Sequence, residues 1–206
     1  MAALVETSGI AFQQTAFPPM PVCRLSVEMY EEMIRSGIIM EDDAIELLDG
    51  WMVPKMTQNP PHILAAEMVR DALHDNVPAG WSVYSGKPIR VGISVPEPDA
   101  MVVRGQRQQF RDRRIQAQDV RLIVEVADTS LWRDKEFKKT IYAQAGIPVY
   151  WLVNLIDNRI EVYSGATGTD EKADYQQRHD YGPGDQIPLT LDGQQIATLS
   201  ARDMLP

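Results

Sequence analysis

Cysteine is nearly absent from this chain, and long apolar runs are missing altogether. The 206 residues include one cysteine, Cys23, which excludes an intramolecular disulfide and a zinc site built from several cysteines. No stretch approaches the roughly 18–20 consecutive apolar residues that a membrane-spanning helix needs. Residues 1–21 also lack the basic start and apolar centre of a signal peptide. These absences favour a cytoplasmic protein in a reducing compartment, without a membrane partner.

Low-complexity tracts are missing as well, and the composition is that of a folded protein. Hydrophobic side chains make up 44% of the residues and charged side chains 24%, which excludes a disordered or fibrous chain. The length fits one domain with a small appendage. We expect an extended arm over residues 1–25, a core over 26–165, and a C-terminal β extension over 166–206 that packs on the same domain.

The net charge of −9 argues against a nucleic-acid partner, because phosphate binding requires basic surface. That average hides an asymmetry. From Arg104 to Lys139 there are ten basic and six acidic side chains, so this stretch carries +4 and the remainder −13. The basic stretch is either a phosphate-facing surface or a solvated loop whose arginines pair with acidic side chains elsewhere.

The first part of the chain predicts two helices and a hairpin. Ser26 is a suitable N-cap for a short amphipathic helix that stops at Gly37. Asp49-Gly50 joins two apolar runs and is typical of a β-hairpin turn. A second helix is expected over residues 62–76, after Pro60-Pro61.

From Trp81 onward the pattern is typical of strands, interrupted by one helix over residues 134–145. The order of helix, three or four strands, helix and strand predicts an α/β fold with a central mixed sheet flanked by helices. The expected strands cover residues 81–84, 89–93, 100–103, 122–126, 149–153, 160–163, 187–191 and 195–199.

Two carboxylates accompany neighbouring apolar strands. Asp99 follows Pro98 at the start of one strand, and Glu125 lies in the centre of the next. An ionised carboxylate buried alone costs several kcal/mol unless it is paired or bound to a cation. Glu125 therefore either faces solvent, with Val124 and Val126 pointing inward, or has a partner.

Asp134, Lys138 and Tyr142 are spaced four residues apart, so they share one face of the predicted helix. The simplest interpretation is an ordinary intrahelical pair between Asp134 and Lys138. If the helix instead packs beside Asp99 and Glu125, the two carboxylates form a site for a hard cation with a fixed positive charge beside it. Such a sparse set of oxygen ligands suits Mg²⁺.

These residues belong to a longer series of segments in a characteristic order. The series is Ile45-Glu46-Leu47-Leu48-Asp49-Gly50, Pro61-His62, Glu97-Pro98-Asp99, Val120 to Val126, Asp134, Lys138, Tyr142, Ala145-Gly146-Ile147-Pro148 and Tyr150-Trp151-Leu152-Val153. Over roughly residues 26–165 the chain resembles the Uma-type putative restriction endonuclease family of the PD-(D/E)XK nuclease superfamily.

The resemblance implies a restriction-endonuclease-like αβββαβ core and metal-dependent hydrolysis of DNA phosphodiester bonds. It implies Asp99 and Glu125 as ligands of Mg²⁺, for which Mn²⁺ would substitute, together with the backbone carbonyl of Val126. The usual lysine lies two residues after the strand acid, where this chain has Ala127. The family resemblance moves that role to Lys138 on the following helix. No organic cofactor is expected.

Five further residues are possible accessories to this site. Glu46 would hold a water or complete the metal shell, or else face solvent. His62 would contact phosphate or cap its helix. Asp128 departs from the Ser-Pro-Ser run common in the family and would add a ligand or disturb the site. The remaining two are Asp134 and Tyr142.

DNA is the expected partner, and five arginines of the basic stretch would contact its backbone: Arg104, Arg107, Arg111, Arg113 and Arg114. Trp132 would stack on a base or, as is commoner for tryptophan, join the core. One site cuts one strand, so double-strand cleavage favours a homodimer. Two rivals stay open: a catalytically inactive nucleic-acid-binding or assembly module with the same fold, and a hydrolase of small phosphoesters.

Overall fold

A computed structural model describes residues 5–7, 10–12 and 22–206. The predicted N-terminal arm lies outside the described residues at 1–4, 8–9 and 13–21. Within that arm, β1 (Val5–Thr7) and β2 (Ile10–Phe12) pair antiparallel. No described helix is long and apolar enough to cross a membrane.

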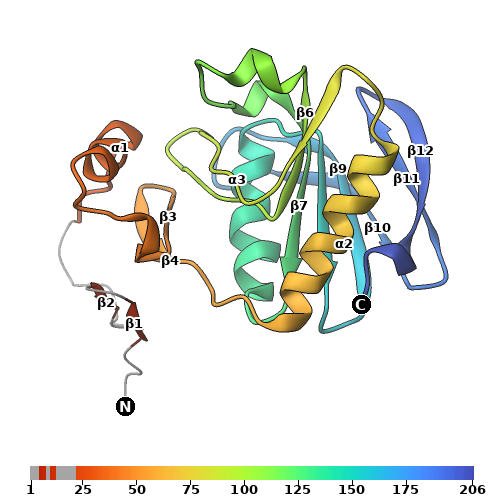
Figure 1. Ribbon diagram of the computed structural model, residues 1–206, viewed down its shortest axis with the longest axis horizontal. Helices are drawn as coiled ribbons and strands as arrows, with labels where there is room; N and C mark the ends of the chain where they lie inside the picture. Colours follow the sequence, from red (N-terminus) through yellow and green to blue (C-terminus); the bar gives the residue numbers. More distant parts are fainter. Residues whose placement is uncertain (1–4, 8–9, 13–21) are drawn as a thin grey trace.

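A six-stranded mixed sheet organises the molecule, as the sequence predicts (Figure 1). Its spatial order is β10-β9-β8-β7-β6-β5, and only β7 and β8 run parallel. A parallel neighbour requires a crossover connection, which the helical segment between β7 and β8 provides. The strands are β5 (Trp81–Tyr84), β6 (Ala100–Arg104), β7 (Val120–Ala127), β8 (Val149–Asn154), β9 (Arg159–Thr167) and β10 (Asp174–Tyr181).

Both faces of the sheet are covered. Helix α2 (Pro60–Asn76) packs on one face, where Leu122, Val124 and Val126 of β7 point. Helix α3 (Lys139–Gln144) packs on the other, where Ile123 and Ala127 point. A central strand covered on both sides is apolar at nearly every position, which explains why β7 does not alternate.

The crossover into α3 is not the single α-helix that the sequence predicts over residues 134–145. A π-helical turn, η4 (Arg133–Lys138), precedes α3. π-helical turns are rare and occur frequently at functional sites. The helix ends before Gly146, whose φ of 70° suits glycine.

The β-hairpin and the first helix lie beside the sheet (Figure 1). Strands β3 (Ile45–Leu48) and β4 (Trp51–Pro54) pair antiparallel around Asp49-Gly50, whose φ values of 50° and 77° allow the tight turn. Helix α1 (Val27–Arg35) begins after Ser26, whose side chain accepts a hydrogen bond from the Met29 amide. Both predictions are confirmed.

The predicted strand over residues 89–93 is wrong. Val91 and Ser94 exchange two backbone hydrogen bonds of 2.8 and 2.9 Å around Gly92, whose φ is 57°, so the chain turns back here. Ile89 and Val91 are apolar because they fill the core on the α3 side. The short 3₁₀ turns η1 (Glu41–Asp43), η2 (Arg107–Phe110), η3 (Ala117–Asp119) and η5 (Ala201–Asp203) complete the connections.

The end of the chain completes the core on the α2 side. Strands β11 (Gln186–Leu191) and β12 (Gln194–Ser200) form a hairpin beside the sheet (Figure 1). Ile187, Leu189 and Leu199 are at most 4% exposed and belong to the same cluster as Leu73 of α2 and Val124 of β7.

Candidate active site

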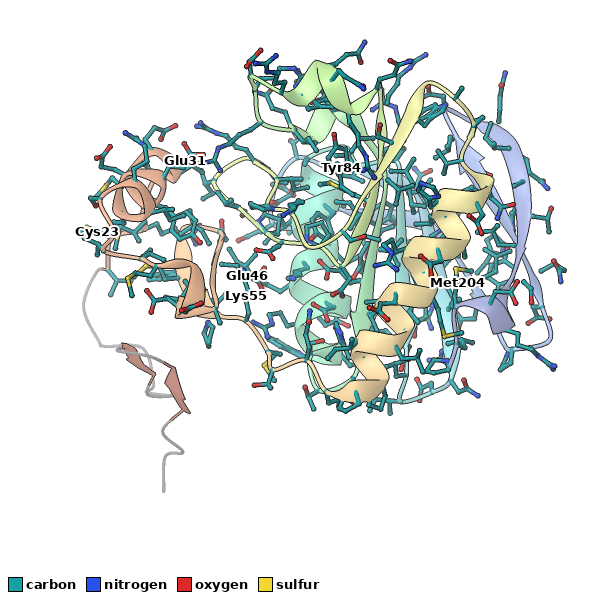
Figure 2. All side chains as sticks on the ribbon, in the orientation of Figure 1. Cys23, Glu31, Glu46, Lys55, Tyr84 and Met204 are labelled. Atoms are coloured by element: carbon teal, nitrogen blue, oxygen red, sulfur yellow. The ribbon has the colours of Figure 1, made fainter. Side chains whose placement is uncertain are left out.

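A polar cleft lies where the β3–β4 hairpin, the start of α2, the starts of β6 and η4, and the end of β7 meet. Figure 2 shows Glu46 and Lys55 in the space between the hairpin and the sheet. The cavity measures about 80 Å³, enough for a few water molecules or a hydrated ion. Its polar lining includes Glu46, Lys55, Gln58, His62, Glu97, Asp99, Glu125, Ser130, Arg133, Asp134 and Lys138.

Lys138 is the centre of the cleft's charge cluster and is 6% exposed. Its Nζ lies 3.2 Å from Glu46 Oε2, 3.2 Å from Glu125 Oε1 and 3.9 Å from Asp134 Oδ1. Burial lowers the pKa of Lys138, but the neighbouring carboxylates raise it by more, so the net shift is upward. Lys138 therefore carries a positive charge at neutral pH.

Glu125 is 2% exposed, so the interpretation that it faces solvent is wrong. Tyr142 donates its hydroxyl proton to Glu125 Oε1 over 2.5 Å, and Lys138 contacts the same oxygen. Burial raises the pKa of Glu125 well above its ordinary value; Lys138 opposes this rise, and the carboxylates of Asp134 and Asp99 add to it. The Glu125 side chain thus has the partners that its place in an apolar strand requires.

Asp99 is fixed from two sides. Its Oδ2 accepts a hydrogen bond of 2.8 Å from the Val126 amide and lies 3.4 Å from His62 Nε2. Burial lowers the pKa of His62, but the hydrogen bond and charge of Asp99 and the nearby Val126 carbonyl outweigh it, and the pKa is raised. His62 does not cap α2, because Asn59 does so by accepting a hydrogen bond from the His62 amide.

Glu46 and Asp134 are buried in the cleft at 3% and 2% exposure, so neither is a solvent-facing residue. Glu46 also lies 3.7 Å from Arg133 Nη1. Asp134 pairs with Lys138 as the helical spacing predicts, but inside the cleft rather than on a solvated face. Burial raises the pKa of Asp134, and the charge of Lys138 lowers it less.

Asp128 lies apart from these groups. It does not line the cleft, and its Oδ2 accepts a hydrogen bond from Asn59 Nδ2 over 2.5 Å. Asp128 thereby ties the N-cap of α2 to the segment after β7. The extra carboxylate that departs from the family pattern has a partner of its own.

Three charged residues of the cleft were missed by sequence reasoning. Lys55 and Glu97 form an ion pair, and Arg133 donates a hydrogen bond of 2.6 Å to the Pro54 carbonyl. Glu97 belongs to the Glu97-Pro98-Asp99 segment, in which the sequence predicts a role for Asp99 alone. Lys55 and Arg133 carry no local signal, because what brings them to the cleft is the docking of the hairpin against η4.

The five arginines of the basic stretch that were expected to contact DNA do not line the cleft. Asp99 precedes β6 and Arg104 ends it, which separates them by about 17 Å at the rise of a strand. Four of the arginines lie near acidic side chains: Arg104 near Asp192, Arg111 near Asp112, Arg113 near Asp119 and Arg114 near Glu31. The guanidinium of Arg107 donates to the Val83 carbonyl and lies over the ring of Tyr84.

The oxygen donors fit a hard divalent cation. The described residues contain no cluster of three or more histidine, cysteine, aspartate and glutamate side chains arranged to hold a metal. Mg²⁺ needs only one or two carboxylates, since waters and substrate phosphate complete its shell. Asp99 and Glu125 supply two carboxylates to the lining of the cleft, and Val126 lies beside them. The His62 Nδ1 atom is buried without a hydrogen-bond partner among the described residues, so this edge of the cleft has unused polar capacity.

Comparison with known proteins gives a consistent result. The family profile described as Uma2, putative restriction endonuclease, matches residues 27–200. A crystal structure described as a putative nuclease belonging to DUF820 from Anabaena variabilis ATCC 29413 has a similar fold, with a TM-score of 0.67 and 14% sequence identity. The match covers 88% of this chain and 97% of that chain. No curated protein matches the sequence.

Proposed function

Because the chain belongs to the Uma2 putative restriction endonuclease family, we propose that it is a metal-dependent endonuclease that hydrolyses phosphodiester bonds of DNA. Family and fold support a nuclease function in general. The observation that carries the specific proposal is the buried cluster in which Lys138 contacts Glu46 and Glu125 beside Asp99.

Asp99, Glu125 and the Val126 carbonyl would hold Mg²⁺, or Mn²⁺ in its place. The ion held by these residues would supply Lewis-acid chemistry at the scissile phosphate and would lower the pKa of an attacking water. The Val126 amide and His62 orient the Asp99 carboxylate for this role. Tyr142 orients Glu125 by donating a hydrogen bond to it.

Lys138 acts electrostatically. Its raised pKa keeps the ammonium protonated at neutral pH, so it cannot accept a proton from water. A compact positive charge in a buried site stabilises the negative charge that grows on the phosphate oxygens. Glu46 and Asp134 hold the ammonium in place as accessory residues.

The substrate strand would extend from the cleft toward the end of β6, where Arg104, Arg107, Arg111, Arg113 and Arg114 would contact the backbone. Of these five, Arg107 alone forms no ion pair with an acidic side chain among the described residues. A homodimer would bring two such sites to the two strands of a duplex.

Plasmid nicking tests the proposal. Purified protein is incubated with supercoiled DNA and Mg²⁺, Mn²⁺ or excess chelator, beside Asp99→Ala and Lys138→Ala. We expect nicking only with metal and a loss of at least about 100-fold in both variants. Asp203→Ala and Lys172→Ala change exposed residues of the same types and should retain activity.

Each other outcome has a definite meaning. Activity that survives Lys138→Ala but not Asp99→Ala would support the carboxylate site and refute the role of the lysine. A folded protein that binds Mn²⁺ but nicks no DNA would favour the catalytically inactive module. Hydrolysis of small phosphoesters without DNA cleavage would favour a hydrolase of small phosphoesters.

A further inference from the structure

Trp132 is 75% exposed at the start of η4. Tryptophan normally buries most of its large surface, so the expectation that this side chain joins the core is wrong. Such exposure of an aromatic ring is informative when it occurs beside a functional cleft. Trp132 directly precedes Arg133 and Asp134, two lining residues of the carboxylate cleft.

An apolar groove adjoins the Trp132 ring. Its volume is about 480 Å³. Its apolar walls come from the hairpin, the segment that follows it and η4: Leu48, Val53, Pro54, Met56 and Phe137. Thr129 and Ser130 add hydroxyl groups to the lining. Met56 is itself 44% exposed, so the groove presents uncovered apolar surface on both sides.

The groove and the carboxylate cleft are adjacent. Met56, Ser130 and Arg133 line both. The hydrogen bond from Arg133 Nη1 to the Pro54 carbonyl fixes β4 against η4 at this junction. A ligand whose phosphate entered the cleft would therefore have its attached group at the mouth of the groove.

We propose that this groove binds the base of the nucleotide next to the scissile phosphodiester, with Trp132 as its stacking partner. The inference rests on the proposed nuclease function. A base has apolar faces and a polar edge, which matches an indole with apolar walls and two nearby hydroxyl groups. Because a base inside a duplex is already stacked, only a single-stranded or locally unpaired nucleotide can enter. The preferred substrate is thus single-stranded or unpaired DNA.

Oligonucleotide binding tests the proposal directly. Affinity is measured by fluorescence anisotropy in Ca²⁺, which takes the same oxygen donors as Mg²⁺. The ligands are a short single strand, the same strand built from abasic sugars, and the duplex of the same sequence. The proteins are wild type, Trp132→Ala, Trp132→Phe and Ile38→Ala, which removes a side chain that is 64% exposed outside both cavities.

We expect Trp132→Ala to weaken binding of the intact single strand by about 5-fold to 150-fold, the range of one stacked base. Trp132→Phe should retain most of the affinity, and Ile38→Ala all of it. On the abasic strand the four proteins should bind alike. Wild type should prefer the single strand to the duplex, and Trp132→Ala should lose that preference.

Equal losses on intact and abasic strands, or no loss in Trp132→Ala, would overturn the proposal. Size-exclusion chromatography with light scattering measures the oligomeric state of Trp132→Ala. If that state changes and the intact and abasic strands bind alike, the proposal is also overturned, because a second copy of the chain would then cover the groove. If the protein binds and nicks DNA regardless of Trp132, only this inference fails. If no nucleic acid binds at all, the proposed function fails with it.

Discussion

At the scale of single residues, Glu125 illustrates a conflict between stability and chemistry. Its carboxylate is 2% exposed in a strand that is buried on both faces. Burial raises its pKa, Lys138 partly compensates, and three further carboxylates oppose its ionisation. A group that is unfavourable for folding but well suited to hold a cation is typical of a functional site.

We predict that Glu125→Gln abolishes DNA cleavage without loss of stability. The amide keeps an oxygen for the Tyr142 hydrogen bond and removes a charge that burial opposes. A carboxyl whose pKa is raised by folding destabilises the protein above its ordinary pKa, near 4.5, and not below it. The variant should therefore equal or exceed wild type by up to about 1 kcal/mol at pH 7. That difference should vanish near pH 4.

Urea unfolding at pH 7 and pH 4 measures the difference in stability, and plasmid nicking measures the loss of DNA cleavage. Glu171→Gln, a change at an exposed position, serves as the control and should alter neither. A variant several kcal/mol less stable than wild type would contradict this prediction and would show that the Glu125 carboxylate stabilises the fold.

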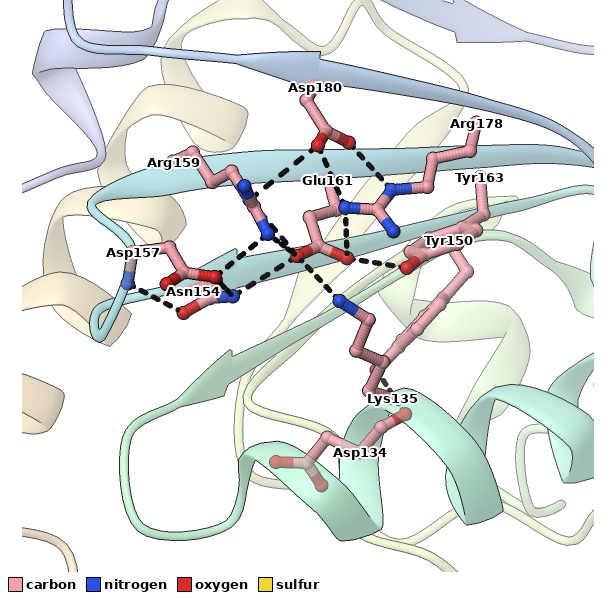
Figure 3. A network of polar contacts seen from close by, with 10 residues as sticks. All are labelled: Asp134, Lys135, Tyr150, Asn154, Asp157, Arg159, Glu161, Tyr163, Arg178 and Asp180. Carbon is pink, nitrogen blue, oxygen red and sulfur yellow. Dashed lines mark hydrogen bonds and ion pairs between the residues drawn. The ribbon is translucent and has the colours of Figure 1, made fainter.

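At the scale of secondary-structure elements, η4 needs an anchor because it carries Asp134 and Lys138. The Tyr150 hydroxyl donates a hydrogen bond of 3.0 Å to the Asp134 carbonyl, and Lys135 Nζ donates one of 3.1 Å to Glu161 Oε1 (Figure 3). Both contacts join the π-helical turn to strands β8 and β9. Tyr150, Lys135 and Glu161 do not line the cleft, so they hold the turn from outside it.

Glu161 is fully buried within that anchor. Five side chains donate to it or pair with it: Lys135, Asn154, Arg159, Tyr163 and Arg178 (Figure 3). Burial raises the pKa of Glu161, but the hydrogen bonds from Tyr163, Asn154 and Lys135 and the charge of Arg178 lower it more, to about 2. The folded state therefore favours the ionised form of the Glu161 carboxyl.

We predict that Glu161→Gln lowers the free energy of unfolding at pH 7 by about 3 kcal/mol, the linkage value of that pKa shift. Because folding depresses this pKa, the contribution is complete above the ordinary value near 4.5 and is lost as the pH falls toward 2. Denaturant unfolding between pH 7 and pH 2.5 should show the two proteins converging. A constant difference across that range would refute the charge-based explanation.

At the scale of the whole molecule, the last strands belong to the central packing. The β11–β12 hairpin contributes Ile187, Leu189, Leu191 and Leu199 to the cluster that includes α2 and β7. Met204 is fully buried in the same cluster. The division of the chain at residue 165 stays a prediction, and this packing makes it testable.

We predict that deletion of residues 182–206 prevents stable folding of the remainder, because it uncovers the α2 face of the core. Leu189→Ala should cost about 2–5 kcal/mol, the range for a buried leucine. Thermal unfolding by circular dichroism measures both, with Gln194→Ala at an exposed position of β12 as the control. A deletion variant that unfolds cooperatively near the wild-type temperature would show that residues 1–181 fold without the β11–β12 hairpin.

Local signals in the sequence determined much of the fold. Ser26 caps α1, Asp49-Gly50 turns the hairpin, and the apolar run from 122 to 126 becomes the central strand β7. Each depends on residues a few positions apart, so local propensity is sufficient to predict it. Strand β10 was missed because it is an edge strand whose residues other than Tyr175 lie largely exposed, which leaves its sequence polar.

The sequence by itself also determined which residues are candidates for the site, since Asp99 and Glu125 stand out against apolar strands and Lys138 lies at helical spacing from Asp134. Only the tertiary structure decided what surrounds them. Glu46 reaches Lys138 across 92 positions of sequence because the hairpin docks on η4. The same docking leaves Trp132 in solvent beside the cleft. Burial and charge pairing depend on which distant segments meet, and no local pattern encodes that.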